Sequence, residues 1–178
     1  HPEQVARLKH ILRAVEDLNL LRIEAPLAEK ENILAVHPQA HIDLIHTNSP
    51  ETGMSQLDGD THMSPGTVTA AYRAAGGAIC AVDTVISGKA KNAFVAIRPP
   101  GHHAEAQIPM GFCIFGNVAI AAKHALDFHK LPKVAVIDFD VHHGNGTQDL
   151  LWNEPRALTV TSHQMPLWPG TGRAEERG

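Results

Sequence analysis

The chain has 178 residues, of which 43% are hydrophobic and 19% are charged, and this composition is typical of globular proteins. A formal net charge of -4 gives no electrostatic basis for nucleic-acid binding, and no apolar run approaches the ~20 residues of a membrane span. Two distant cysteines, Cys80 and Cys113, exclude a disulfide framework and favour a reducing compartment. We therefore expect a single domain over residues 1–178 in a soluble, cytoplasmic protein.

The N-terminal half is predicted to be mainly helical. Apolar residues at three- and four-residue spacing predict an amphipathic helix over residues 1–20, and the mixed pattern that follows indicates short helices and loops. Ser64-Pro65 is a helix start signal, and the apolar segment behind it predicts a buried or half-buried helix from Val68 to Ile86. Within that helix, Gly76 and Gly77 should permit close packing against a neighbour.

The C-terminal half alternates between apolar runs and helical patterns. The predicted strands are 93–97, 134–137 and 157–161, and the predicted helices between them are 117–128 and 147–152. Residues 92–139 thus have the strand, helix, strand form of a parallel unit. The alternation predicts an α/β protein with a mainly parallel sheet and helices on both faces.

The residues that follow a strand are the first candidates for a site, because ligands of open α/β sheets bind at the carboxyl ends of strands. Asp138, Asp140 and His142 follow the 134–137 run and would share one face of an extended chain. A carboxylate and an imidazole suit zinc or another divalent transition metal, so Asp140 and His142 are candidate ligands. Asp138 is then available to orient a histidine. The non-functional alternative is that these acidic residues cap the following helix and that the histidines are ordinary surface residues.

A second pair of histidines, His102 and His103, follows a rigid Pro-Pro-Gly turn after the 93–97 run. One of them could take a proton from an attacking water and later protonate a leaving group. Such a pair alone could be an exposed loop, but two His-His pairs at adjacent strand ends favour a site. The histidines without companions in the sequence are interpreted as surface or packing residues: His10, His37, His41, His46, His124 and His129.

Three long stretches carry a resemblance: Arg98-Pro-Pro-Gly-His-His103, Met110-Gly-Phe-Cys113 and Val136-Ile-Asp-Phe-Asp-Val-His-His-Gly-Asn-Gly-Thr-Gln148. With them the sequence resembles the zinc-dependent histone deacetylase family, including its bacterial class II-like and acetylpolyamine amidohydrolase members. Weaker similarity reaches Pro169-Gly-Thr-Gly172. The resemblance implies a three-layer α/β/α fold of the arginase and deacetylase type, incomplete at its C-terminal side. It also implies hydrolysis of an acetyl-lysine-like amide at one Zn²⁺ ion.

The resemblance assigns roles residue by residue. Asp140 and His142 match the family's zinc ligands, and His102 and His103 match its catalytic histidines, with His103 as the principal general base and acid. Asp138 matches the acid that partners the first histidine. The further positions implied are a monovalent cation site, such as one for K⁺, at Asp138 with Thr161 or Ser162; the substrate residues Gly111, Phe112 and Asp60; and the supporting residues Asn145, His143 and Arg7.

The family's third zinc ligand and its oxyanion-stabilising tyrosine would lie beyond Gly178, so we expect little activity from these 178 residues alone. A dinuclear manganese ureohydrolase of the same fold is an alternative, although Gly144 stands where its additional carboxylate would be needed. A catalytically inactive acyl-lysine binding module is another. The implied partner is an acetylated lysine peptide, protein or polyamine, without nucleic acid or membrane, and the oligomeric state is left open.

Overall fold

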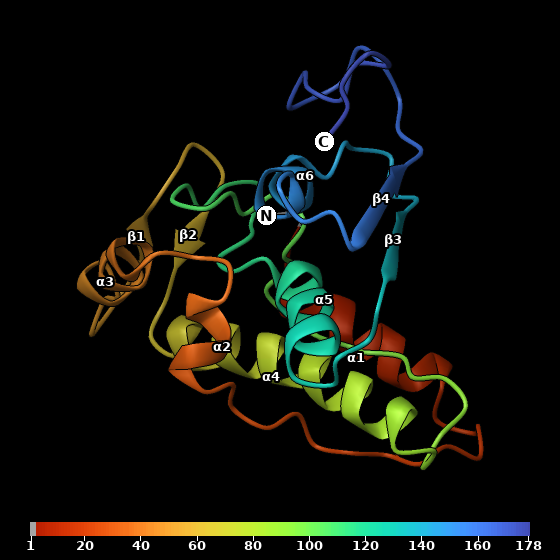
Figure 1. Ribbon diagram of the computed structural model, residues 1–178. Coiled ribbons are helices and arrows are strands. Elements are labelled where there is room, and N and C mark those ends of the chain that lie inside the picture. The colour runs from red at the N-terminus through yellow and green to blue at the C-terminus, as the bar shows by residue number, and fades with distance from the viewer. Residues whose placement is uncertain (1–2) are drawn as a thin grey trace.

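A computed structural model describes residues 3–178 (Figure 1). The helices are α1 (Val5–Ala14), α2 (Lys30–Leu34), α3 (Gln39–Thr47), α4 (Thr67–Ile86), α5 (Asn117–Asp127) and α6 (Asn145–Leu151), and the strands are β1 (Ser55–Gln56), β2 (His62–Met63), β3 (Val134–Asp138) and β4 (Ala157–Thr161). None of the helices in the described part of the chain combines the length and apolar character needed to cross a bilayer.

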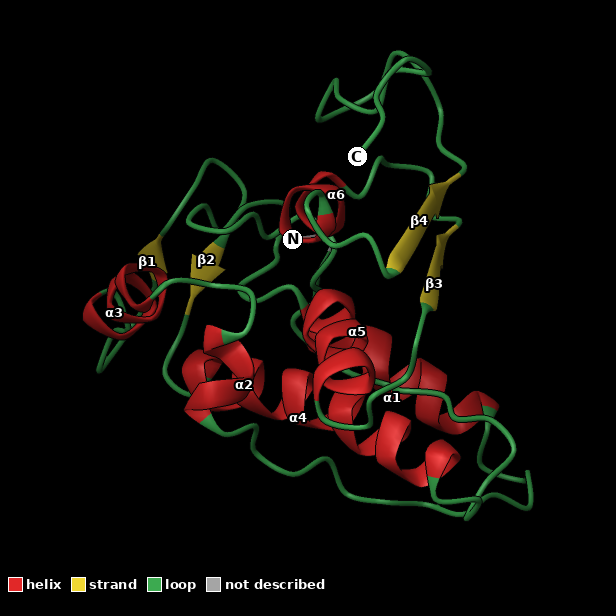
Figure 2. Ribbon diagram, viewed as in Figure 1, coloured by secondary structure: helices red, strands yellow, loops and turns green. Residues whose placement is uncertain are grey.

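The long helix α4 packs against α5, and α5 in turn packs against β3 (Figures 1 and 2). The close packing predicted for Gly76 and Gly77 is confirmed. A Cβ atom added at Gly76 would collide with the carbonyl oxygen of Pro26 and lie 2.7 Å from the backbone nitrogen of Ala28. At Gly77 it would lie 3.2 Å from Cβ of Ala25. The two glycines therefore let residues 25–28 run directly along α4.

The main apolar core is formed by side chains of α2, α3 and α4 together with Phe115, which is fully buried. It also contains two buried histidines, His37 and His41, whose rings stack with centroids 4.4 Å apart. Both histidines bind backbone atoms of a distant segment. Nδ1 of His37 lies 3.1 Å from the carbonyl oxygen of Ala106, and its Nε2 accepts the N–H of Gly116. The interpretation of these histidines as packing residues agrees with this arrangement, which anchors the 106–116 loop to the core.

β3 and β4 form a parallel pair in which Val134 lies opposite Ala157 and Asp138 opposite Thr161. α6 connects the two strands, and α5 and α6 cover one face of the pair. The other face exposes apolar side chains, among them Ile137, whose side chain is 69% exposed.

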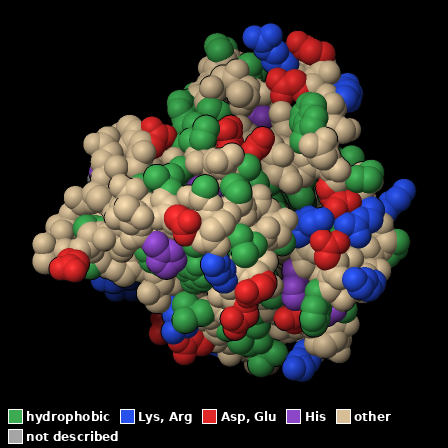
Figure 3. Space-filling view, turned by 60° about the vertical axis from the view of Figure 1, so that its left-hand side comes forward, with side chains coloured by type: hydrophobic (Ala, Val, Ile, Leu, Met, Phe, Trp, Pro, Cys, Tyr) green, Lys and Arg blue, Asp and Glu red, His purple; other side chains and the backbone are tan. Residues whose placement is uncertain are grey.

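On the molecular face shown in Figure 3, acidic and basic side chains are interspersed rather than gathered into a stripe of one sign.

The predicted strand at 93–97 is wrong. These residues belong to none of the strands in the described part of the chain, and Phe94 is 74% exposed. The strand, helix, strand unit proposed for residues 92–139 is therefore wrong as well, and the parallel unit is instead β3, α6 and β4. An apolar run becomes a strand only where a neighbouring strand accepts its backbone hydrogen bonds, and here none is placed beside it.

One predicted helix boundary and one predicted helix cap also differ. The amphipathic helix predicted for residues 1–20 is confined to α1, and residues 1–2 lie outside the described residues. The start signal Ser64-Pro65 forms a turn rather than a cap. The carbonyl oxygen of Ser64 accepts the N–H of Thr67, and α4 begins only after Gly66, whose φ is 88°. The left-handed Gly66 separates Ser64-Pro65 from the first turn, so the helix starts at Thr67, one residue before the predicted Val68.

Candidate active site

The tandem histidines lie at the centre of the site, in the turn before α5. Their ring centroids are 3.9 Å apart, and His103 is only 4% exposed. The carbonyl oxygen of His102 accepts the N–H of Thr147 in α6. A Cβ on Gly146 would lie 2.5 Å from the carbonyl carbon of Ala104, so the first turn of α6 sits directly on this segment. The histidine turn is thereby fixed to α6.

His102 pairs with Asp138, the last residue of β3. Nδ1 of His102 lies 2.9 Å from Oδ2 of Asp138. Burial raises the pKa of Asp138, but the hydrogen bonds from His102 and from the backbone N–H of Asp140 outweigh it and hold the pKa below its ordinary value. Gly144 makes room for the pair, because a Cβ there would collide with the Asp138 carboxylate. Asp138 is therefore ionised at neutral pH and lies next to a catalytic candidate.

His103 pairs with Asn145 instead of a carboxylate. Nδ1 of His103 lies 2.8 Å from Oδ1 of Asn145, and Nδ2 of Asn145 donates to Oε1 of Glu105 at 2.7 Å. This second bond fixes the amide so that its oxygen faces the ring, which places the ring proton on Nδ1. Burial, followed by the nearby His102, lowers the pKa of His103 to about 4. His103 is therefore neutral at pH 7, with the Nε2 lone pair available.

Asp140 and His142 meet in a turn, not on one face of an extended strand as predicted. β3 ends at Asp138, whose Oδ1 accepts the N–H of Asp140, and Oδ1 of Asp140 accepts the N–H of His142. The same Asp140 oxygen lies 3.1 Å from Nδ1 of His142. Two ligands about 2.0–2.1 Å from a tetrahedral zinc ion are about 3.3 Å apart, so this half-exposed pair fits one ion.

Gly111 and Phe112 form a tight turn in which both residues are left-handed, with φ of 57° and 66°. Phe112 carries a bulky side chain in a conformation that disfavours one, so its backbone must be held in place. The N–H of Gly111 donates to Oδ1 of Asp60 at 3.2 Å, and the N–H of Phe112 donates to Oγ1 of Thr61 at 3.0 Å. Asp60, predicted as a substrate residue, thus supports this turn, as does Thr61, which the sequence analysis did not single out.

Trp168 is a site residue that the sequence analysis missed. Its ring centroid lies 4.6 Å from that of His103 and 6.2 Å from that of His142, in edge geometry. Gly111 is packed against this ring, since a Cβ built on Gly111 would lie 2.7 Å from Cη2 of Trp168. The sequence feature that could have identified Trp168 is its position immediately before Pro169-Gly-Thr-Gly172, a stretch with weak similarity to the deacetylase family. An aromatic side chain therefore closes one side of the site.

The structure brings the two histidine turns together, since the centroids of His103 and His142 are 6.0 Å apart. Ser162 also adjoins the site, because its N–H donates to the carbonyl oxygen of Asp138 at 2.9 Å, whereas Oγ1 of Thr161 lies 2.9 Å from Nδ1 of His163. The remaining supporting candidates bind elsewhere: His143 bonds Thr171 and Gln148, and Arg7 donates to the carbonyl oxygen of Ile97. Burial lowers the pKa of His143.

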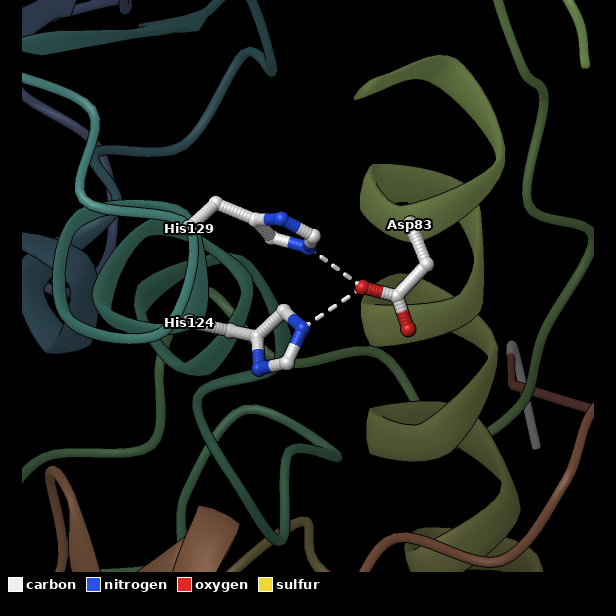
Figure 4. A group of neighbouring side chains, drawn as sticks. All are labelled: Asp83, His124 and His129. Carbon is white, nitrogen blue, oxygen red and sulfur yellow. Dashed lines mark hydrogen bonds and ion pairs between the residues drawn. The ribbon is translucent and has the colours of Figure 1, made fainter. Parts of the chain in front are cut away.

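A second histidine cluster lies apart from these turns, on α4, on α5 and in the bend that follows α5. Nε2 of His124 and Nε2 of His129 lie 2.7 Å and 2.6 Å from the same oxygen of Asp83 (Figure 4). These two histidines, interpreted as surface or packing residues because they have no companions in the sequence, share an acidic partner in the fold. They are five positions apart and their acidic partner is more than 40 residues away, so no spacing in the sequence points to the cluster.

The family model described as "Histone deacetylase domain" matches residues 1–178. The chain is 39% identical to a probable deacetylase of Archaeoglobus fulgidus, covering 100% of this chain and 50% of the relative. It is also 39% identical to a histone deacetylase-like amidohydrolase of Pseudomonas aeruginosa, covering 99% and 47%. The chain thus spans about half the length of the curated relatives it matches.

Among solved structures, the crystal structure of the HDA15 HD domain matches with a TM-score of 0.92 and 34% identity, covering 97% of this chain and 52% of that chain. The predicted fold class, a three-layer α/β/α arginase and deacetylase fold present in part, is confirmed by this match. The family match extends over all the elements that carry the site. The chain belongs to the histone deacetylase domain family.

Proposed function

We propose that the protein containing this chain is a zinc-dependent amidohydrolase that removes acetyl or other acyl groups from lysine side chains or polyamines. The observation that carries the proposal is the convergence of the tandem histidines with the Asp140 and His142 pair, since His103 and His142 are 6.0 Å apart between ring centroids. Family membership supports deacetylase activity in general. Because the chain covers about half of these relatives, the activity is proposed for the whole protein.

His103 is the principal general base and general acid in this proposal. It is neutral at pH 7, and the bond from Nδ1 to Asn145 leaves Nε2 able to accept a proton. It would take the proton of a water that attacks the acyl carbon and return it to the departing amine nitrogen. His102 would assist, since its ring centroid lies 3.9 Å from that of His103. The ionised Asp138, hydrogen-bonded to Nδ1 of His102, supplies a negative charge nearby.

Asp140 and His142 would hold the zinc ion. Their donor atoms have the chemistry and the separation that one ion needs, 3.1 Å between Oδ1 and Nδ1. A bound zinc ion supplies Lewis acidity toward an acyl oxygen and toward water. Catalytic zinc sites use three protein ligands, so the proposal requires one more ligand, which we expect after Gly178.

The acyl chain would lie beside the ring of Trp168 and the Gly111-Phe112 turn. Trp168 stands edge-on to His103, and Gly111 lies against both the imidazole and the ring of Trp168. Apolar walls favour a neutral acylated chain over the charged ammonium that hydrolysis releases, because a charge loses hydration there. Asp60 anchors the turn and would also meet substrate backbone at the rim. The choice between a histone, another protein and a polyamine is left to experiment.

Two further assignments belong to the same proposal. A monovalent cation, K⁺, would sit where Asp138 meets Thr161 and Ser162 across the parallel pair. Cys80 and Cys113 are both free thiols, which supports a reducing compartment such as the cytoplasm.

The test is hydrolysis of an acetyl-lysine peptide and of an acetylated polyamine by the intact protein, with acetate release as the readout. We expect turnover that a chelator removes and Zn²⁺ restores. His103→Ala should lower kcat by at least about 10²-fold, as expected for loss of a general base. The matched control is His10→Ala, an exposed histidine on α1, which should leave kcat unchanged.

Other outcomes would overturn the proposal in distinct ways. Two manganese ions per chain with urea release from a guanidino substrate would identify a ureohydrolase. Saturable binding of an acetyl-lysine peptide without acetate release would identify a binding module. Residues 1–178 alone should show little turnover, and full activity from them would contradict the need for a further metal ligand.

A further inference from the structure

We propose that Asp83, His124 and His129 form a second metal site, which binds a divalent transition metal ion between α4 and α5. The site is distinct from Asp140 and His142 and lies outside the proposed catalytic machinery. Its donors are one carboxylate oxygen and two imidazole nitrogens, all within 4.8 Å of one another. Two histidines and one carboxylate are a donor set that suits zinc and its neighbours in the first transition row.

The backbone brings the two histidines together at the end of α5. His124 is in the last turn of the helix, and the N–H groups of both Phe128 and His129 donate to its carbonyl oxygen. Lys130 then turns the chain with a φ of 57°. As a result, both Nε2 atoms point to the same oxygen of Asp83, which projects from the last turns of α4 (Figure 4). Three donors, from α4, from the last turn of α5 and from the bend that follows it, thus converge at one point.

The imidazole rings are held in this orientation by packing. The ring of Phe128 stacks on His124 with centroids 4.8 Å apart and an interplanar angle of 12°, and it meets the ring of His129 edge-on. His124 is nearly buried and His129 is 19% exposed, whereas Asp83 is 47% exposed. The site is therefore preorganised on the histidine side and open to solvent on the carboxylate side, where an ion can arrive.

The distances define what must change when an ion binds. Each Nε2 atom is 2.6–2.7 Å from the Asp83 oxygen, a hydrogen-bond length, whereas ligands of one tetrahedral zinc ion are about 3.3 Å apart. Each separation must grow by about 0.6–0.7 Å, and a half-exposed carboxylate can supply this by rotating. Both rings then bind through Nε2 and carry their remaining proton on Nδ1. Solvent or a further ligand completes the coordination.

An ion in this place would join α4 to α5, the helices that connect the main core to β3. A ligand that binds only the folded state stabilises it by mass action, so the ion should raise the melting temperature of the protein. At an ion concentration about 100-fold above the Kd, the expected rise is about 5–10 °C for 178 residues and smaller for a longer intact protein. The role is structural and does not depend on the deacetylase proposal.

The experiment uses the intact protein carrying Asp140→Asn and His142→Asn, so that the proposed catalytic zinc ligands do not bind the probe ion. Co²⁺ is the probe, followed by its visible d–d absorption and by calorimetric titration, and Zn²⁺ is then tested by thermal unfolding. We expect saturable binding of one Co²⁺ per chain with a tetrahedral spectrum. Adding Asp83→Asn or His129→Asn should weaken binding by at least about 100-fold. Adding His10→Asn is the matched control and should leave it unchanged.

If Asp83→Asn does not fold, as judged by circular dichroism, His129→Asn decides the outcome, because it leaves the Asp83 bond to His124 in place. Absence of saturable Co²⁺ binding in the Asp140→Asn, His142→Asn protein overturns the proposal. So does binding that neither variant weakens, since the ion would then be held elsewhere. In both cases the role of the three side chains is limited to the hydrogen bonds that connect α4 to the end of α5.

Discussion

Gly111 lies directly against the imidazole of His103. A Cβ built on Gly111 would lie 2.7 Å from Cγ of His103 and 2.7 Å from Cη2 of Trp168, and the glycine adopts a φ of 57°. Gly111→Ala should therefore push His103 out of line with the Asp140 and His142 pair. Because misplacement by about 1 Å can cost about 10²-fold in rate, we expect kcat/KM of the intact protein on an acetyl-lysine peptide to fall by about that factor.

Gly53→Ala is the matched control for this substitution. Gly53 also has a left-handed backbone, with a φ of 72°, but no heavy atom lies within 4 Å of the position its Cβ would take. It should therefore show the backbone strain of a side chain at positive φ without the loss of rate. Equal kcat/KM values for the two variants would contradict the contact between Gly111 and His103.

Gly76→Ala should destabilise the protein although alanine is the better helix former. The added Cβ would meet backbone atoms of Pro26, Leu27 and Ala28, which cannot move aside as a flexible side chain could. Overpacking of this kind outweighs the gain of about 1 kcal/mol in helix propensity, and we expect a net loss of about 2 kcal/mol in the free energy of unfolding. Urea denaturation gives the value. Gly59→Ala, where nothing lies within 4 Å, should change it little.

The stability of the fold should fall with pH below about 6.5 because of His37. Burial, followed by the charge of a protonated His41, lowers the pKa of His37 to about 4. The unfolded chain takes up this proton near pH 6.5 while the folded chain stays neutral, so the free energy of unfolding decreases as pH falls from 6.5 to 4. The contribution of this group is about 3 kcal/mol, and it levels off below pH 4.

His37→Asn should make that pH dependence shallower while lowering stability at pH 7, because the bonds to Ala106 and Gly116 are lost. Denaturant unfolding at several pH values between 7 and 4 measures both effects. His10→Asn, on the exposed surface of α1, should retain the full slope. A slope that His37→Asn leaves unchanged would show that other groups carry the pH dependence.

Cys113 should not react with alkylating agents in the native protein. Its side chain is fully buried, and burial raises the pKa of its thiol to about 12, so both access and the reactive thiolate are missing. Cys80 is partly exposed and should be labelled by iodoacetamide while Cys113 is protected. Peptide mass spectrometry separates the two. In urea both should react at similar rates, and early labelling of Cys113 in buffer would contradict its burial beneath Gly111.

The elements that the sequence predicted well are those with a strong local signal. α4, α5 and β4 follow the predicted limits closely, because long apolar segments with clear ends depend little on their surroundings. The 93–97 run failed since a strand requires a partner, and a partner is a property of the fold and not of the run. The same applies to Ser64, whose backbone forms a turn with Thr67 where a cap was predicted.

Within the candidate site, the motif residues were predictable from spacing, but their partners were only in part. Asn145 follows His142 closely in sequence, so its place beside His103 could be inferred from the resemblance. Trp168 and Thr61 reach the site from distant loops, and no periodicity connects them to it. Asp83 could not be identified for the same reason, since its two histidine partners come from α5 and the bend that follows it.

The attachment of the histidine turn to α6 has a mechanical consequence. Asn145 orients His103, Gly146 rests on Ala104, and Thr147 binds the backbone of His102, so three successive residues of one short helix grip three successive residues of the turn. Any displacement of that helix would carry the imidazoles with it as one unit. The alignment of the proton-transferring groups is thus set by the docking of a helix, and not by the freedom of the loop in which they stand.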